Sequence, residues 1–286
     1  MTASGLSFSC MAVFVKQLTG LIPHFELVFF RAFINLIPVL AIVLYRREKL
    51  FPPGTGILTI RGLAGFGGLC CVFYAMAHLP LSIAVMLLWC SPIFVILFSW
   101  LFLREKLHPW QLVAVAIAFV GLILLLRPDW SGARSLPIGA TIIGLFGAVF
   151  SGLAYVAVRA ATARVGVNLI VLYFVAISTI LSAPLAVRNF YLPNPREAIR
   201  LLIIGVLATA SQFTMTQAYR YAPAGQVSTM GLMNAAFSAL FGWVLFDERL
   251  AGLQWLGMGL LSAGVAFLSL GGKNLAHRGK TPLGTG

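Results

Sequence analysis

The chain repeats itself along its length. Residue n and residue n+143 align without a gap when Tyr74 to Arg127 is placed on Gln217 to Leu270, and 143 is half of the 286 residues. A shared apolar bias would align many Leu and Ala, but it would not bring Pro, Trp, Glu and Gln into one register. The coinciding pairs include Pro80 and Pro223, Phe94 and Phe237, Phe98 and Phe241, Trp100 and Trp243, Glu105 and Glu248, Gln111 and Gln254, and Gly121 and Gly264. We therefore predict a duplicated unit, with residues 1–130 as the first copy, 131–272 as the second and 273–286 as a disordered tail.

Composition places the two copies in a membrane. Hydrophobic residues make up 60% of the chain and charged residues only 9%, whereas soluble domains carry about 25% charged residues. A helix needs about 20 apolar residues to cross the bilayer, and charge clusters, Pro and Gly divide the sequence into runs of about that length. The ten predicted spans are 2–19, 25–45, 57–78, 81–103, 109–127, 137–159, 167–187, 197–219, 224–246 and 252–271. The predicted fold is an all-α membrane protein of ten transmembrane helices, with the lipid bilayer as its partner.

The distribution of basic residues sets the predicted orientation. Ten spans bring both termini to one side of the membrane, where 12 of the 20 Lys and Arg residues fall, Arg61 among them. The other side holds 8, including Arg31. By the positive-inside rule, both termini then lie in the cytoplasm. Because each copy holds an odd number of spans, the copies enter the membrane in opposite directions, and such inverted repeats are a recurring basis of alternating access in secondary transporters.

Charge and cysteine content exclude several other classes of protein. The net charge of +13 does not indicate nucleic-acid binding, because the basic residues stand at span ends rather than on one solvated face with aromatics between them. Attraction to anionic lipid accounts for them better. The four cysteines lie in apolar runs without metal-ligand spacing, so neither a metal nor another cofactor is predicted. The first apolar run lacks a basic leading segment and a cleavage site, and we interpret it as the first span.

Short motifs at the ends of the spans add a family resemblance. A proline opens the fourth and ninth spans (Pro80, Pro223), and an acidic-basic turn closes each of them (Arg104 to Leu107, Asp247 to Leu250). The first span carries Ser7-Phe8-Ser9 and Val15-Lys16, and the second carries Phe30-Arg31-Ala32-Phe33. With the inverted repeat, this pattern resembles the drug/metabolite transporter superfamily, specifically its EamA-type carriers, over essentially the whole chain. The resemblance implies a bacterial inner-membrane carrier with a central cavity between the repeats, lined mainly by the third, fourth, eighth and ninth spans. It also implies small metabolites as substrates, with amino acids and aromatic amino acids among those that bacterial members export.

Polar residues within the spans are the candidates for substrate contact. They are costly in lipid and are expected to face the interior, and they are most frequent in the eighth and ninth spans, where Ser211, Gln217 and Asn234 lie. Gln217 and Asn234 are the preferred contacts, because an amide can donate to a carboxylate and accept from an ammonium group. The alternative is that these side chains only make hydrogen bonds between helices.

The corresponding part of the first copy is more aromatic. Trp89 and Tyr74 are predicted to form an apolar wall opposite the amides, which would suit a ligand with an apolar side chain and a polar head. Tyr155 and Ser151 in the sixth span are further candidates. Glycines at spacings that let helices approach closely, such as Gly65 and Gly264, are interpreted as packing positions.

Prolines and one histidine are the candidates for gating. Pro92 interrupts the predicted fourth span and permits a bend, whereas its repeat counterpart is Ala235, so the two hairpins are not expected to bend alike. Pro80 and Pro223 are candidates because they open the fourth and ninth spans, which belong to the two hairpins expected to move in gating. His78, just before Pro80, would serve as a gate or pH sensor, or else is a solvated histidine at the interface.

The positions of the carboxylates bear on mechanism. All seven acidic residues fall in loops or at span ends, so no carboxylate is predicted at mid-membrane to carry a proton. The predicted function is a secondary carrier, a monomer or weak homodimer, that exports small metabolites, chiefly aromatic or other apolar amino acids, without obligatory proton coupling. Proton-coupled efflux is the alternative. A channel would be expected to show a charged ring or a carbonyl filter, and an enzyme would need clustered His, Asp or Cys.

Overall fold

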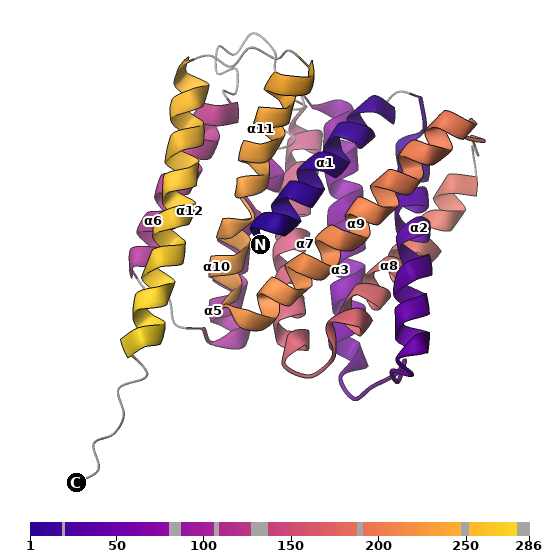
Figure 1. Ribbon diagram of the computed structural model, residues 1–286, viewed down its shortest axis with the longest axis horizontal. Coiled ribbons are helices and arrows are strands. Elements are labelled where there is room, and N and C mark those ends of the chain that lie inside the picture. The colour runs from indigo at the N-terminus through magenta and orange to yellow at the C-terminus, as the bar shows by residue number, and fades with distance from the viewer. Residues whose placement is uncertain are drawn as a thin grey trace.

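The computed structural model describes residues 1–18, 21–79, 87–105, 109–126, 137–187, 191–246 and 252–278. Every element in these ranges is an α-helix, as the composition predicts (Figure 1). The helices are α1 Thr2–Leu18, α2 His24–Tyr45, α3 Thr55–His78, α5 Ser91–Leu103, α6 Pro109–Leu126, α7 Ile138–Thr162, α8 Val167–Val187, α9 Pro195–Tyr221, α10 Ala224–Met230, α11 Met233–Phe246 and α12 Gly252–Arg278. The last of these continues past residue 272, where a disordered tail was expected to begin.

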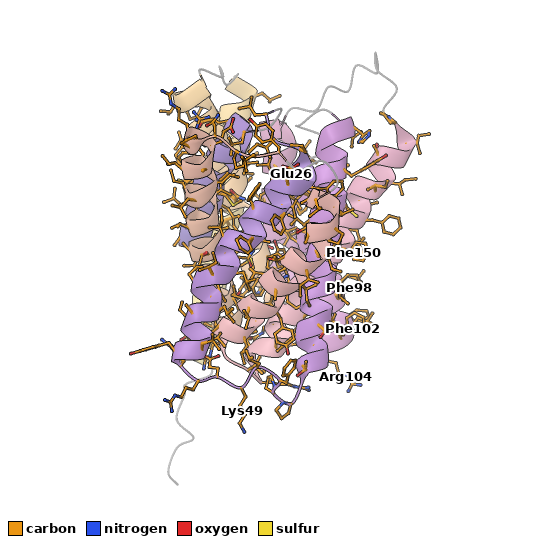
Figure 2. All side chains as sticks on the ribbon, turned by 90° about the vertical axis from the view of Figure 1, so that its right-hand side faces the viewer. Glu26, Lys49, Phe98, Phe102, Arg104 and Phe150 are labelled. Atoms are coloured by element: carbon orange, nitrogen blue, oxygen red, sulfur yellow. The ribbon has the colours of Figure 1, made fainter. Side chains whose placement is uncertain are left out.

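The helices form a bundle with an apolar outer surface. Within the described residues, five helices are long and apolar enough to cross a membrane, and shorter apolar helices accompany them. Figure 2 shows Lys49 and Arg104 at one end of the bundle and Glu26 toward the other, with Phe102 and Phe150 on the side between them. Both of these phenylalanines are exposed. Charges at the ends and apolar side chains around the middle are the distribution expected of helices surrounded by lipid.

Helices from the two halves of the chain pack against each other in matched pairs. In the 143-residue register, α1 corresponds to α7, α3 to α9 and α5 to α11. The structure pairs α3 with α7 and α1 with α9, and it likewise pairs α5 with α7 and α1 with α11. Helices α2 and α8, which correspond to each other, also pack together, as do α6 and α12. Each of these contacts therefore either has an equivalent contact, formed when the two halves exchange roles, or joins two helices that are themselves equivalent.

The pair α6 and α12 packs backbone against backbone at two equivalent glycines. A Cβ atom on Gly121 would lie 2.3 Å from the backbone nitrogen of Leu261, and one on Gly264 would lie 2.7 Å from that of Ala118. Neither backbone can accept a side chain there, so these two positions fix the distance between the helices. Packing was the role predicted for Gly264.

The predicted ninth span is not one helix. It divides into α10 and α11 at Gly231 and Leu232, where the amides of Asn234 and Ala235 bond to carbonyls only three residues back, at 3.0 and 2.9 Å. This tightened turn replaces the regular four-residue pattern.

The fourth span shows a break at the equivalent position. Trp89 and Cys90 form a turn before α5 begins at Ser91, and residue 89 corresponds to residue 232. The two spans therefore both break at this position of the repeat. Pro92 lies in the first turn of α5, where its missing N–H breaks no helical hydrogen bond, and the second copy breaks without a proline. Its gating role stays a prediction.

Candidate functional site

Two arginines lie inside the bundle rather than at its ends. Arg61 on α3 is 3% exposed, and Arg31 on α2 is half-buried, with its Nε atom inaccessible to solvent. From the sequence, Arg61 was expected on the cytoplasmic side of the membrane and Arg31 on the opposite side. Leaving Arg31 and Arg61 out of the count of basic residues lowers it by one on each side of the membrane. The positive-inside rule therefore still places both termini in the cytoplasm. Because an ionisable group in a membrane span is costly, each of these positions indicates a function.

Arg61 contacts helices from the second half of the chain. Its Nη2 donates to Oε1 of Gln212 on α9 at 3.3 Å, and its Cζ lies 4.2 Å from the ring centroid of Phe174 on α8. The second contact is a cation–π interaction, which is strongest where the cation has lost its water. The Nε of Arg61 has no hydrogen-bond partner among the described residues.

A glycine makes room for this guanidinium group. A Cβ atom on Gly65, one turn after Arg61 on α3, would lie 2.2 Å from Nη1 of Arg61 and 2.8 Å from the Phe174 ring. The glycine spacing of this helix was interpreted as close packing of helices. At Gly65 the space is occupied by the arginine itself.

Two tyrosines from the second half complete the group. Tyr155 on α7 and Tyr219 on α9 stack with ring centroids 5.6 Å apart and planes 19° apart. Tyr219 is fully buried, and its hydroxyl has no partner among the described residues. Arg31 and Arg61 both lie within electrostatic range of Tyr155 and of each other.

We call these five residues, which come from four helices, the arginine–tyrosine cluster. They are Arg31, Arg61, Tyr155, Gln212 and Tyr219. The cluster joins α2 and α3 of the first half to α7 and α9 of the second.

No carboxylate among the described residues neutralises the cluster, because all four that the structure describes are engaged elsewhere. Glu26 accepts from the backbone N–H of Tyr191, Glu48 from the amide of Asn168, and Glu197 from the backbone of Asn194 at the start of α9. Glu105 pairs with Arg159. Within the described chain, the cluster is a buried positive site.

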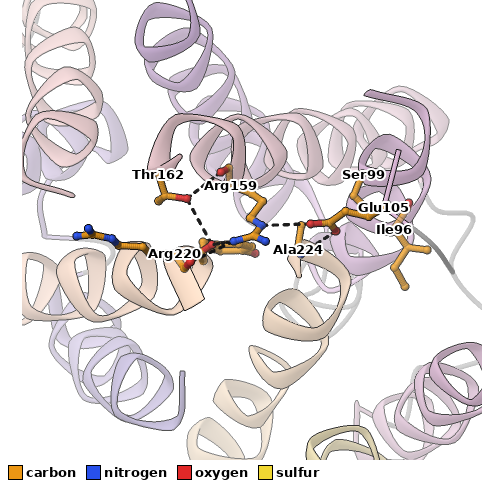
Figure 3. Close-up of polar contacts among 8 residues, drawn as sticks. Ile96, Ser99, Glu105, Arg159, Thr162, Arg220 and Ala224 are labelled. Carbon is orange, nitrogen blue, oxygen red and sulfur yellow. Dashed lines mark hydrogen bonds and ion pairs between the residues drawn. The ribbon is translucent and has the colours of Figure 1, made fainter. Parts of the chain in front are cut away.

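Glu105 and Arg159 form a second polar contact between the two halves (Figure 3). Arg159 Nε lies 3.1 Å from Glu105 Oε1, and Arg159 Nη1 donates to the backbone oxygens of Tyr219 at 2.9 Å and Arg220 at 3.2 Å, at the end of α9. Glu105 Oε2 accepts from the backbone N–H of Ala224 at 3.1 Å. Glu105 of the first half thus caps the first turn of α10 from the second half. We call this set the Glu105–Arg159 bridge.

The predicted amide contacts lie apart from the cluster. Gln217 donates to the hydroxyl of Tyr221 on its own helix at 3.2 Å. The amide of α9 that contacts Arg61 is instead that of Gln212. Asn234 lies just after the break between α10 and α11, where its backbone oxygen accepts from Ser9 at 3.0 Å and its side chain also bonds with Ser9. The bonds between Asn234 and Ser9 join α11 to α1, which is the interhelical role of the alternative interpretation, whereas the bond of Gln217 stays within α9.

The remaining predicted residues are dispersed. Tyr74 stacks on His78 at 4.1 Å and both are exposed, while Trp89 packs against the buried cluster around Leu232 and Leu261. The other positions are as follows: Ser211 is buried and bonded to Ala208 of its own helix, Ser151 lies against Gly68, Pro223 precedes α10, and Pro80 is outside the described residues. Of the predicted residues, only Tyr155 belongs to the cluster.

Sequence reasoning missed the two arginines although a signal was present. Arg31 falls within the predicted span 25–45 and Arg61 within 57–78, so both were charges inside apolar runs. Tyr219 had no such signal, because tyrosine is common at span ends.

Comparison with known proteins adds family information. The model of the EamA-like transporter family matches the chain at residues 1–127 and again at 138–270. The pseudopaline exporter of Pseudomonas aeruginosa is 33% identical, over 86% of this chain and 86% of that protein. Solute carrier family 35 member G1 of Mus musculus is 28% identical over 86% of this chain and 70% of that protein. A riboflavin transporter of Vibrio cholerae is 29% identical over 68% of this chain and 65% of that protein.

One solved structure bears on the fold. The crystal structure of another protein aligns with a TM-score of 0.82 over 98% of this chain and 96% of the other, at 21% sequence identity. The helical arrangement is therefore shared at low sequence similarity.

Proposed function

Since this chain belongs to the EamA-like transporter family, we propose that it is a secondary carrier that exports a small metabolite by alternating access. The observation that carries this proposal is the matched packing of equivalent helices from the two halves. Two copies of one unit with opposite orientations can exchange conformations, so that one end of the molecule opens as the other closes. We propose that the ten spans form such an inverted pair in the bacterial inner membrane, with both termini in the cytoplasm.

The Glu105–Arg159 bridge would close the cytoplasmic end of this carrier. It ties the end of α5 to α7, to the last carbonyls of α9 and to the first amide of α10. Under the proposed orientation these four helix ends all lie at the cytoplasmic surface. Movement of α5 away from α7 and α10 would break the ion pair with Arg159 and the hydrogen bond from Ala224 together, which favours two discrete states over a gradual opening.

The breaks before α5 and between α10 and α11 support a transport path near them. Non-helical backbone at membrane depth is tolerated where protein or an aqueous path surrounds it, and discontinuous helices often form the substrate sites of transporters. The equivalent position of the two breaks makes them a property of the repeated unit.

We propose an amino acid or a related metabolite with an apolar part as the substrate. The relatives named as a pseudopaline exporter and a riboflavin transporter are consistent with small-molecule cargo. Transport as a facilitator is favoured because Glu26, Glu48, Glu105 and Glu197 all have structural partners near helix ends. Proton-coupled transport is the alternative.

Reconstitution in liposomes tests these points together. The purified protein would be supplied with a panel of labelled amino acids, each with and without an imposed pH difference. We expect concentration-driven flux of at least one apolar or aromatic member without a pH difference. Flux that stops when the pH difference is abolished would favour the proton-coupled alternative, and absence of flux for the whole panel would remove amino acids as the substrate class.

A further inference from the structure

We propose that the arginine–tyrosine cluster is a binding site for a carboxylate group, so that the transported molecule is a carboxylate-bearing anion or zwitterion. This inference deepens the proposed function and rests on it. It begins from the charge of the cluster. Arg61 is 3% exposed and Arg31 has a buried Nε, yet neither has an acidic partner within the described chain. A buried charge without a partner is unfavourable, so a bound anion would supply the negative charge that the described residues do not provide.

The free hydrogen-bond donors of the cluster fit that anion. In the described chain, the Nε atoms of Arg31 and Arg61 and the hydroxyl of Tyr219 are buried without partners. A guanidinium group presents its N–H donors in a planar fork that matches the two oxygens of a carboxylate. Gln212 and Phe174 already hold Arg61 on one side, so its remaining Nε donor is oriented before a ligand arrives.

The structure also contains a feature that serves this arginine specifically. Gly65 leaves the space in which the guanidinium lies, because a Cβ atom there would be 2.2 Å from Arg61 Nη1. An arginine whose role was to set topology at a span end would need no such space.

The location of the cluster suits transport. Arg31 and Arg61 come from the first half of the chain, whereas Tyr155, Gln212 and Tyr219 come from the second. A carboxylate held here would touch both halves, which must move relative to each other when access alternates. Tyr219 further links the site to the Glu105–Arg159 bridge, because its backbone oxygen accepts from Arg159 at 2.9 Å.

Thermal unfolding of the full-length protein in lipid nanodiscs tests for carboxylate binding. The probes are 3-phenylpropionate, its neutral amide 3-phenylpropionamide, and inorganic phosphate. The proteins are the wild type, Arg61→Gln and Arg196→Gln, where Arg196 is an exposed arginine on α9 and serves as the matched control. We expect the carboxylate to raise the unfolding midpoint of the wild type and of Arg196→Gln, and its apparent affinity to fall at least tenfold in Arg61→Gln.

Three results would overturn the site. They are an equal response to the amide, a response to phosphate that equals or exceeds that to the carboxylate, and an affinity in Arg61→Gln within about twofold of the wild type. Gly65→Ala provides a second route if Arg61→Gln does not fold. Its added methyl group displaces the guanidinium while the charge is retained, and we expect the same loss of affinity.

Labelled flux separates this inference from the proposed function. Carboxylate binding that requires Arg61, without flux of any amino acid, would leave the site in place and overturn the proposed substrate class. Amino-acid flux with unchanged rate and affinity in Arg61→Gln would overturn the site and leave the carrier in place.

Discussion

At the scale of single residues, α9 carries two amides whose surroundings differ. Gln212 is 4% exposed and accepts from Arg61 at 3.3 Å, whereas Gln217 donates to Tyr221, a 75% exposed residue of its own helix. Sequence reasoning preferred Gln217, because residue type alone cannot show which face of a polar helix meets the buried arginine. The structure shifts the expected substrate contact toward Gln212.

Gln212→Ala should therefore reduce transport more than Gln217→Ala. Loss of the Gln212 side chain removes the hydrogen bond that orients the Arg61 guanidinium. A hydrogen bond to a charged group contributes about 1.5–3 kcal/mol. We expect flux in liposomes to fall about tenfold for Gln212→Ala and to stay within about twofold for Gln217→Ala. Equal losses in the two variants would contradict the assignment.

Removal of the Glu105 carboxylate should have a measurable effect on the stability of the protein. Glu105→Gln keeps the shape of the side chain and an oxygen that can accept from Ala224, but it removes the ion pair with Arg159. We expect the free energy of unfolding to fall by about 1–2 kcal/mol, because both partners are largely buried and charge-assisted bonds are the stronger kind. Glu48→Gln is the matched control, because Glu48 bonds to the neutral amide of Asn168, and its loss should be below about 1 kcal/mol.

At the scale of helices, the sequence predicts where most elements lie but not where two of them break. Predicted and observed bounds agree within a few residues for most spans, because apolar runs and charge clusters are direct consequences of membrane thickness. The break at Gly231 and Leu232 has no proline, and the predicted span 224–246 continues through it without a charged residue, so hydropathy does not reveal it. Arg31 and Arg61 could have been identified as intramembrane charges, whereas the stacking of Tyr155 on Tyr219 depends on helix packing across 64 residues of chain.

The pair of helices α6 and α12 gives a prediction at this scale. Gly121→Ala and Gly264→Ala each insert a methyl group against backbone atoms that lie 2.3 and 2.7 Å from the added Cβ. Overpacking of this kind costs about 1–3 kcal/mol. We expect both variants to unfold at lower temperature or denaturant concentration than the wild type. Gly259→Ala on α12 is the control, because nothing lies within 4 Å of its Cβ, and its stability should be unchanged or slightly higher.

At the scale of the whole molecule, equivalent helices of the two halves meet in equivalent ways. The α3–α7 contact corresponds to the α1–α9 contact, and the α5–α7 contact to the α1–α11 contact. The 143-residue register also makes Lys16 equivalent to Arg159 and Glu248 equivalent to Glu105, so each copy carries a cation and a carboxylate at the same sequence positions. The family resemblance seen in the short motifs is confirmed by the two matches of the family model.

An alternating carrier and a channel differ in how a substrate on one side affects flux from the other. The binding site of a carrier must return to its starting side before the next transport event, either with substrate bound or empty. If the return of the empty site is slow, substrate on the opposite side of the membrane speeds it. We expect liposomes preloaded with unlabelled substrate to take up the labelled form several-fold faster than empty liposomes. A channel would show no such acceleration, because its two openings are not alternated. The measurement requires a substrate found by the flux panel, and equal initial rates with and without preloading would contradict the two-state cycle that the paired halves and the Glu105–Arg159 bridge support.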